Sequence, residues 1–146
     1  MLTLSLALEK SAYAVGERII GTVVLRNCGA ASVRVNARLA WNVECAPPQC
    51  REIRFIVRDE AGREVPCRMF VNVGAPRNAD VIELQAGEAV EKQYELTRGY
   101  RLVRLGAYSV QAVYENLSAW EEPGPKPWKG RLASNVVRIT IGRHLL

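Results

Sequence analysis

The sequence predicts an all-β protein, an antiparallel β-sandwich of about seven to nine short strands, formed by a single domain over residues 1–146. Short runs of alternating apolar and polar residues recur along the chain, separated by Gly, Pro and Asn turns, and no long run has a helical period. The most informative run is Gly106–Tyr114, in which a glycine leads into a strand with Tyr108 near its start. A tyrosine at this place in a late strand is typical of a sandwich corner, where its hydroxyl bonds back to the preceding loop.

The first half of the chain is predicted to form strands joined by turns. Residues 2–9 carry leucine at every second position, which predicts a strand with one buried face. Residues 13–17 are expected to form a turn into a strand at 18–27, which is apolar on both faces for part of its length, as an inner strand is. Residues 32–41 show the cleanest alternation, and we expect Trp41 in the core or at its edge.

The second half continues the same pattern. A strand at 53–58 is expected to pair with one at 64–71 through a hairpin turn at 59–63. Two Pro-containing or Gly-containing stretches, 42–51 and 73–80, are predicted loops. Further strands are expected at 81–85, 89–97, 106–114 and 132–142, with a turn at 86–88 and a long Pro-rich connection at 116–131.

Composition narrows the classes of function. The net charge is +5, but the arginines are scattered along strands among acidic residues, which indicates a solvated face rather than a nucleic-acid stripe. No run of 18 apolar residues exists, so no transmembrane segment is expected. The opening residues lack a basic leader and a cleavage site, so the chain as written is expected to be cytoplasmic; it would be secreted if Met1 replaces a removed leader.

The four cysteines leave two states open. Cys45 and Cys50 flank a short Pro-containing loop, where a local disulfide is sterically easy in an oxidising compartment, and free thiols are the alternative. The spacing fits no common zinc pattern, because no second close pair and no nearby histidine completes a ligand set. We therefore expect no metal and no cofactor.

The sequence contains few of the residue types that catalytic sites use. The only histidine is His144, which we expect to be a solvated tail residue, so a base for a hydrolytic triad is lacking. Glutamates that would form a glycosidase-like pair are present, but most surface glutamates have no such role. The expectation is a protein that is not an enzyme.

The best candidate surface is the connection 116–131, which is longer than a usual hairpin loop. Two tryptophans on a Pro-stiffened loop offer rigid apolar area, as binding hot spots do. The alternative is that the two indoles fold back over the open end of the sandwich and cap its core. The candidate binding residues are Trp120, Pro125, Pro127, Trp128 and Lys129.

Several turn and core motifs recur in an order that is typical of a known class of domain. They are Tyr13-x-x-Gly16-Glu17, Val23-x-Leu25-x-Asn27-x-Gly29, Ile82-x-Leu84-x-Ala86-Gly87-Glu88, Tyr94-x-Leu96, Gly106-x-Tyr108-x-Val110 and Ser134-Asn135-x-Val137-x-Ile139. Together they resemble bacterial immunoglobulin-like, or fibronectin III-like, domains. In particular, their order resembles the accessory domain that precedes the catalytic domain of deuterolysin-like, lysine-specific metalloendopeptidases and, more distantly, bacterial intracellular proteinase inhibitors. The His-Glu-x-x-His helix of such zinc peptidases is absent, so peptidase activity is not implied for this chain.

These observations favour a non-enzymatic binding or accessory module whose partner is another protein. The alternative is a proteinase inhibitor that inserts an exposed loop, 45–50 or 116–131, into a protease cleft. A structural role is a third hypothesis, in which the strand at 2–9 or the strand at 81–85 pairs with a neighbouring copy to form an oligomer.

Overall fold

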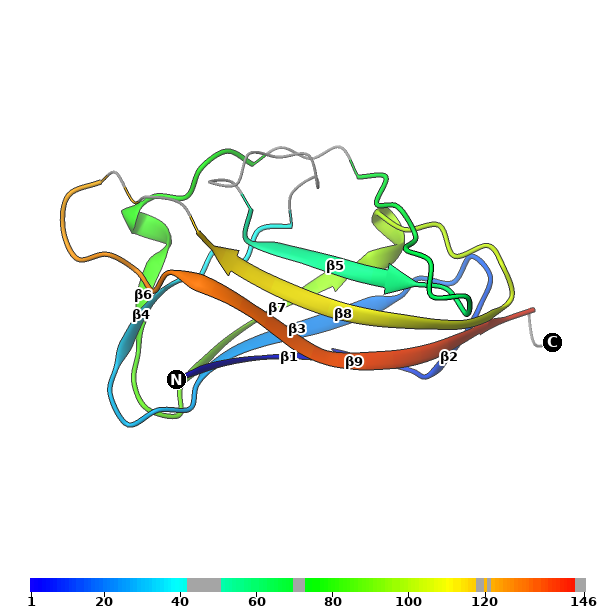
Figure 1. The fold of residues 1–146 in the computed structure, drawn as a ribbon, viewed down its shortest axis with the longest axis horizontal. Helices are drawn as coiled ribbons and strands as arrows, with labels where there is room; N and C mark the ends of the chain where they lie inside the picture. The colour runs from blue at the N-terminus through cyan, green and yellow to red at the C-terminus, as the bar shows by residue number, and fades with distance from the viewer. Residues whose placement is uncertain (42–50, 70–72, 118–119, 121, 144–146) are drawn as a thin grey trace.

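Nine strands and two short 3-10 helices make up the part of the chain that the structure, a computed structural model, describes, namely residues 1–41, 51–69, 73–117, 120 and 122–143 (Figure 1). The elements are β1 (Leu2–Leu8), β2 (Ala12–Ala14), β3 (Ile20–Asn27), β4 (Val33–Asn36), β5 (Ile53–Arg58), η2 (Asn78–Asp80), β6 (Val81–Leu84), β7 (Ala89–Glu95), η3 (Leu96–Arg98), β8 (Gly106–Asn116) and β9 (Gly130–Gly142).

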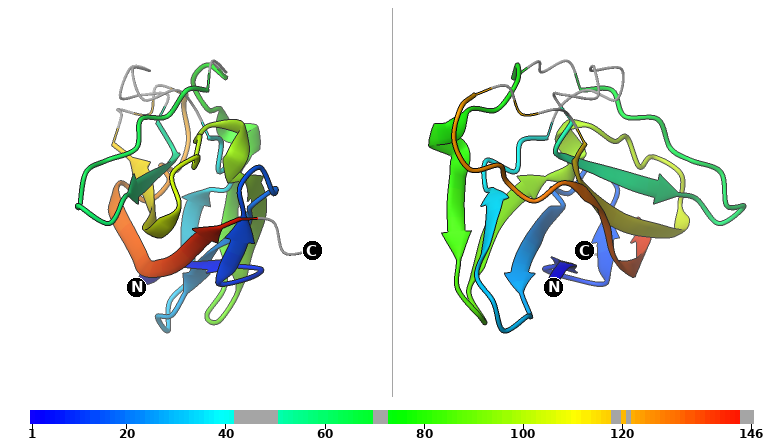
Figure 2. Two further views of the ribbon diagram at one scale, coloured as in Figure 1. Left: turned by 90° about the vertical axis from the view of Figure 1, so that its right-hand side faces the viewer. Right: turned by 60° about the vertical axis from the view of Figure 1, so that its left-hand side comes forward.

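The strands form two packed sheets and a small two-stranded ribbon. One sheet has the order β1-β3-β7, the other has the order β2-β9-β8-β5, and β4 pairs with β6. Figure 2 shows the two larger sheets as separate layers. Every pairing between named strands is antiparallel except that of β2 with β9, which is parallel. The predicted immunoglobulin-like sandwich is therefore confirmed, because β1, β3 and β7 form one sheet and β5, β8 and β9, together with β2, form the sheet that faces it.

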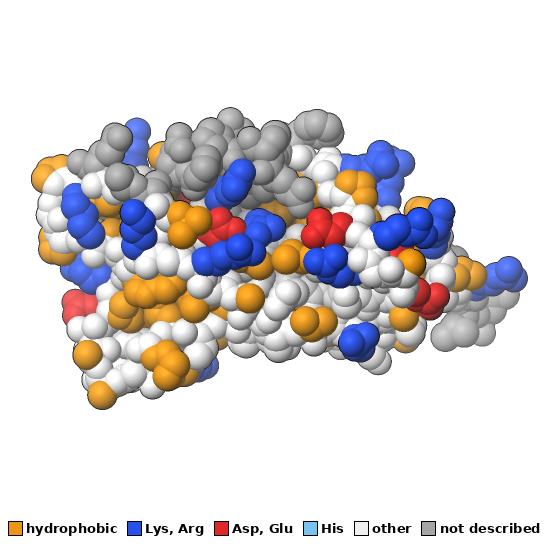
Figure 3. All heavy atoms as spheres, in the orientation of Figure 1, with side chains coloured by type: hydrophobic (Ala, Val, Ile, Leu, Met, Phe, Trp, Pro, Cys, Tyr) orange, Lys and Arg blue, Asp and Glu red, His pale blue; other side chains and the backbone are white. Residues whose placement is uncertain are grey.

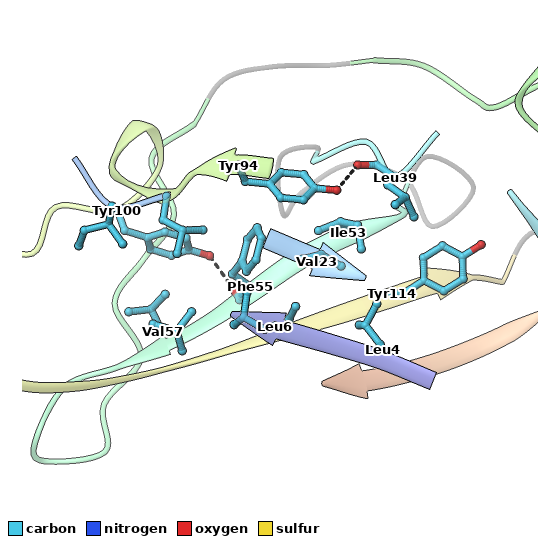
Figure 4. Packing of buried hydrophobic residues seen from close by; sticks show 14 of the residues in the cluster. Leu4, Leu6, Val23, Leu39, Ile53, Phe55, Val57, Tyr94, Tyr100 and Tyr114 are labelled. Atoms are coloured by element: carbon cyan, nitrogen blue, oxygen red, sulfur yellow. Dashed lines mark hydrogen bonds between the residues drawn. The ribbon is translucent and has the colours of Figure 1, made fainter. Parts of the chain in front are cut away.

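The core lies between the two sheets and follows the alternation of the strands. On β3, the predicted inner strand, Val23 and Leu25 are fully buried, and β3 does lie between two neighbours. Phe55 and Val57 of β5 enter the same core from the opposite sheet (Figure 4). Val110 is buried in the core on β8. Val23 and Val110 therefore occupy the two places where an immunoglobulin domain would carry the cysteines of its inter-sheet disulfide.

The predicted tyrosine corner is present at the start of β8. The hydroxyl of Tyr108 donates a hydrogen bond to the carbonyl of Arg104, at 2.8 Å. Gly106 has a φ of 131°, and a Cβ at this position would lie 2.6 Å from the Glu60 carboxylate. That carboxylate accepts a hydrogen bond from the backbone N–H of Ala107, at 2.7 Å. The glycine is thus required by both its backbone conformation and its close neighbour.

Trp41 lies at the edge of the core, as predicted. Its ring stacks on Tyr100 with centroids 6.0 Å apart and meets Phe55 edge to face at 5.3 Å. Tyr100 in turn donates its hydroxyl hydrogen to the Phe55 carbonyl, at 2.8 Å (Figure 4).

The prediction of one continuous strand at 32–41 is wrong. β4 ends at Asn36, and Leu39 has a φ of 50°, in the left-handed region, so the alternation of faces is broken. Arg38, expected on the solvent face, instead turns its guanidinium onto the buried carboxylate of Glu52. An ion pair with a buried partner thus overrides the local pattern.

Two other expectations at element boundaries are corrected. Residues 13–17 are not wholly a turn, because Ala12–Ala14 forms β2 alongside the end of β9. The predicted strand at 64–71 reduces, in its described part, to a single bridge between Arg58 and Glu64 and a hydrogen bond from the Val65 N–H to the Val57 carbonyl, at 2.7 Å. No helix among the described residues is long and apolar enough to cross a membrane.

Side chains of Ser134 and Asn135 join the sheets where β8 and β9 lose register. The Ser134 hydroxyl accepts a hydrogen bond from the Ala112 N–H at 2.8 Å, beside the irregularity between Gln111 and Val113. The Asn135 amide then bonds to both backbone groups of Leu6 on β1, accepting at 2.9 Å and donating at 3.0 Å. One asparagine side chain therefore occupies the edge of β1 as a neighbouring strand would.

Replacing Asn135 with alanine should lower the free energy of unfolding by about 1–2 kcal/mol, because two backbone groups of Leu6 lose their partner. Urea denaturation followed by tryptophan fluorescence measures this change. Asn135→Asp is the matched variant, since it keeps an acceptor for the Leu6 N–H but loses the donor to its carbonyl. Equal stability of the wild type and Asn135→Ala would show that the hydrogen bonds between Asn135 and Leu6 do not stabilise the fold.

Candidate functional site

The two tryptophans of the predicted binding loop have different environments. Trp128 is half-buried and its ring stacks on Tyr114 of the core, with centroids 6.0 Å apart and planes 18° from parallel. Its backbone N–H donates to the Arg34 carbonyl at 2.7 Å, and its carbonyl accepts from the Asn116 amide at 2.6 Å. A Cβ at Gly130 would lie 2.7 Å from the indole, so the ring rests directly on that backbone. This packing is what the capping interpretation expects of Trp128.

Trp120 lies outside the core and is fixed by a polar contact. Its indole N–H donates to the side-chain oxygen of Asn78 in η2, at 2.6 Å, and the residue, like Trp128, is partly buried. The Asn78 N–H donates to the Glu122 carboxylate at 2.8 Å, and its amide donates to the Pro123 carbonyl at 3.0 Å. A single asparagine therefore anchors three residues of the loop.

The loop is also tied together from within. The ammonium group of Lys126 donates to the carbonyls of Trp120 and Glu122, at 2.8 and 2.7 Å. Of the other predicted site residues, Pro125 and Lys129 are exposed. Pro127, in contrast, is buried beside the capping tryptophan. Of the predicted binding residues, Pro125 and Lys129 therefore face solvent, whereas Pro127 and Trp128 pack inward.

Asn78 was not singled out by the sequence, although it completes this site. The signal available was weak: Asn78 and Asp80 lie two positions apart in a Gly-containing loop, and the Asp80 carboxylate accepts a hydrogen bond from the Arg77 N–H at 2.8 Å. That pattern predicts a local turn but does not predict which distant loop the turn will hold.

A charged face adjoins the site along β5 and β8. Arg54 pairs with the buried Glu115 at 2.8 Å, and Arg131 approaches the same carboxylate at 3.9 Å. Figure 3 shows basic and acidic side chains interspersed across this side of the molecule. The arginines of this face are thus partly used in ion pairs rather than gathered in a stripe of one sign.

A second polar cluster lies inside the sandwich. The Glu52 carboxylate accepts hydrogen bonds from Arg38 and from the Ala40 N–H, the latter at 3.1 Å. Burial, together with the negative charge of Glu52, raises the pKa of Tyr94 and Tyr114 above the usual range for a phenol. Both phenols donate to backbone carbonyls, which places them in structural roles.

Among the described residues, no group of three or more His, Cys, Asp or Glu side chains is arranged to hold a metal ion. The predicted Cys45–Cys50 loop and His144 lie outside the described residues. The described part of the β8–β9 loop offers a contact surface with a tryptophan held by a hydrogen bond.

No protein-family model matches the sequence, and no curated protein matches it. Among solved structures, the chain is similar to the CARDB domain of a Pyrococcus furiosus protein in complex with di-metal ions, with a TM-score of 0.47 and 12% identity over 99% of this chain and 94% of that one. It is also similar to the sporulation control protein Spo0M from Bacillus subtilis, with a TM-score of 0.47 and 17% identity over 98% of this chain and 50% of that one.

These likenesses concern the fold alone, and the chain spans only half of the Spo0M chain that it matches. The class defined by the strand pairing is a β-sandwich domain. The finer resemblance to peptidase accessory domains or proteinase inhibitors is not confirmed by these matches and stays a prediction.

Proposed function

We propose that this chain is a non-enzymatic protein-binding module and that its contact surface is the loop between β8 and β9, centred on Trp120. The observation that carries the proposal is the anchoring of Trp120 through its indole N–H to Asn78 outside the hydrophobic core, with the residue only partly buried. Tryptophan is among the residues most enriched at the centres of protein interfaces.

Contacts that fix the described residues 120 and 122–126 of the loop support the proposal through their effect on binding entropy. The contacts of Asn78 with Glu122 and Pro123, and those of Lys126 with two carbonyls, hold the loop before any partner arrives. A surface that is already ordered loses less conformational freedom on binding, so more of its contact energy appears as affinity. The exposed Pro125 extends this surface with an apolar, rigid residue.

The test separates Trp120 from the capping tryptophan. Immobilised wild-type protein and Trp120→Ala are compared for capture of partners from a lysate of the source organism, with quantitative mass spectrometry. We expect a partner whose recovery falls at least about tenfold with Trp120→Ala, which corresponds to roughly 1.4 kcal/mol of binding energy. The melting temperature should stay close to that of the wild type, because this side chain is outside the core.

Val136→Ala is the matched control, since Val136 is an exposed apolar residue in the middle of β9 and away from the loop. Its capture profile should equal that of the wild type. If Trp120→Ala and Val136→Ala retain the same partners at the same recovery, the loop is not the contact surface.

The inhibitor alternative is tested with the same variants. A panel of serine proteases and metalloproteases is assayed with an excess of the protein. Inhibition that Trp120→Ala abolishes would assign the loop to a protease cleft. Absence of inhibition, together with Trp120-dependent capture of a protein that is not a protease, leaves the binding-module proposal in place.

A further inference from the structure

A cavity of about 310 Å³ opens at the end of the sandwich opposite to the Trp120 loop, beside β2 and the chain that follows η3 (Figure 1). Its lining includes the buried side chains of Ile19, Tyr100 and Ile141 and the half-buried Val15 and Leu102. Small-molecule sites are concave, mostly apolar and roughly 300–1,000 Å³ in volume, so this cavity lies at the small end of that range.

Among the described residues, the ion pairs around the cavity leave one positive group without a partner. Glu17, which contributes to the lining, pairs with Lys10, and the neighbouring Arg18 pairs with Glu95 at 3.1 Å. Arg101 also lines the cavity, is exposed, and makes no ion pair or side-chain hydrogen bond within the described part of the chain. An anion that enters the cavity would therefore meet an arginine whose donors are available.

The sequence around Arg101 accentuates this pattern. Between residues 96 and 114 the chain has no acidic residue, whereas Arg98, Arg101 and Arg104 recur at every third position. Two apolar side chains of the same segment are unusually exposed: Val103 at 67% and Leu105 at 49%. Of these, Val103 lines the cavity together with Arg101, so among the described residues an exposed apolar side chain and an arginine without an ion pair occur side by side in its lining.

We propose that this cavity is a binding site for a small amphiphile with an apolar chain and a single carboxylate, such as a medium-chain fatty acid. The chain lies against Val15, Leu102 and the buried floor, and the carboxylate accepts hydrogen bonds from Arg101. A guanidinium group matches a carboxylate with two parallel N–H donors, and such charge-assisted bonds are about twice as strong as neutral ones. This site is independent of the protein-binding surface proposed above.

The test is an NMR titration of the isotopically labelled chain with octanoate below its micelle concentration, supported by calorimetry. We expect saturable shifts at Val15, Thr97 and residues 101–103, all of which line the cavity. Octanol lacks the charge, octylamine reverses it, and acetate lacks the apolar chain, so each should bind at least tenfold more weakly.

Arg101→Gln removes the charge from an exposed side chain and should weaken octanoate binding about tenfold with no change in melting temperature. Arg104→Gln is the matched control, because it removes a charge from the same segment without altering the lining of this cavity. Equal weakening by both variants would overturn the site in favour of general charge attraction. Absence of saturable octanoate binding, or octanol binding as tightly as octanoate, would also overturn it.

Discussion

Replacing Glu52 with alanine should lower the free energy of unfolding by about 3 kcal/mol, near the lower end of the range for breaking a buried ion pair. Glu52 is only 2% exposed, and its carboxylate accepts from Arg38 and from the buried N–H of Ala40. Without it, the Ala40 N–H loses its acceptor, and the Arg38 guanidinium loses its charged partner and retains the carbonyls of Val73 and Gly74, at 3.2 and 2.8 Å. The Arg38 side chain retains 20% exposure, so some water reaches it and moderates the loss.

Urea denaturation measures the effect, and Glu64→Ala provides the matched control. Glu64 pairs with Arg58 at 3.5 Å, but both side chains are well exposed, so its loss should cost less than about 1 kcal/mol. The double variant Arg38→Met with Glu52→Leu should recover much of the stability, because two apolar groups leave no uncompensated charge. Equal losses for Glu52→Ala and Glu64→Ala would show that burial of the first pair has no energetic consequence.

The same ion pair explains where sequence reasoning about the fold failed. Alternation located β1, β3, β5, β8 and β9 because each has one face on a common core. Residues 37–41 alternate equally well, yet the chain leaves the strand there to bring Arg38 onto Glu52, which lies 14 positions further along. A local pattern carries no information about which distant carboxylate an arginine will meet, so the break was not predictable.

The lost strand at 64–71 has a similar cause on the edge of β5. The Phe55 carbonyl, which a neighbouring strand would use, accepts the hydroxyl hydrogen of Tyr100 instead, at 2.8 Å. In the described part of 64–71, the backbone contacts with β5 are the hydrogen bond from the Val65 N–H to the Val57 carbonyl and the isolated bridge between Glu64 and Arg58. A tyrosine from a distant crossover thus competes for the edge, and hairpin signals at 59–63 do not reveal it.

At the candidate site, too, the local sequence does not predict which distant residues a side chain will contact. In the sequence, Trp120 and Trp128 are two similar residues on one Pro-rich loop, and both binding and capping fit them. What distinguishes them is their contacts: Trp128 rests on Tyr114 and the backbone of Gly130, whereas Trp120 reaches Asn78. The glycine two positions after Trp128 is the one local hint, because it leaves room for a ring.

Replacing Trp128 with alanine should lower the free energy of unfolding by about 2–3 kcal/mol, somewhat less than the value for a fully buried tryptophan because the residue is half-exposed. The substitution removes the ring that stacks on Tyr114 and covers Gly130, and so opens the end of the core to water. The backbone contacts of residue 128 with Arg34 and Asn116 do not depend on the ring. The loss of stability therefore measures the contribution of the indole as a cap on the core.

Thermal and urea unfolding of three variants would decide between capping and binding as the role of this ring. Trp128→Phe keeps an aromatic cap on Tyr114 and should lose less than half as much stability as Trp128→Ala. Trp120→Ala should stay within about 0.5 kcal/mol of the wild type, since its side chain lies outside the core. If Trp128→Ala is as stable as Trp120→Ala, the stacking on Tyr114 does not stabilise the sandwich, and the indole of Trp128 would belong with that of Trp120 in the contact surface.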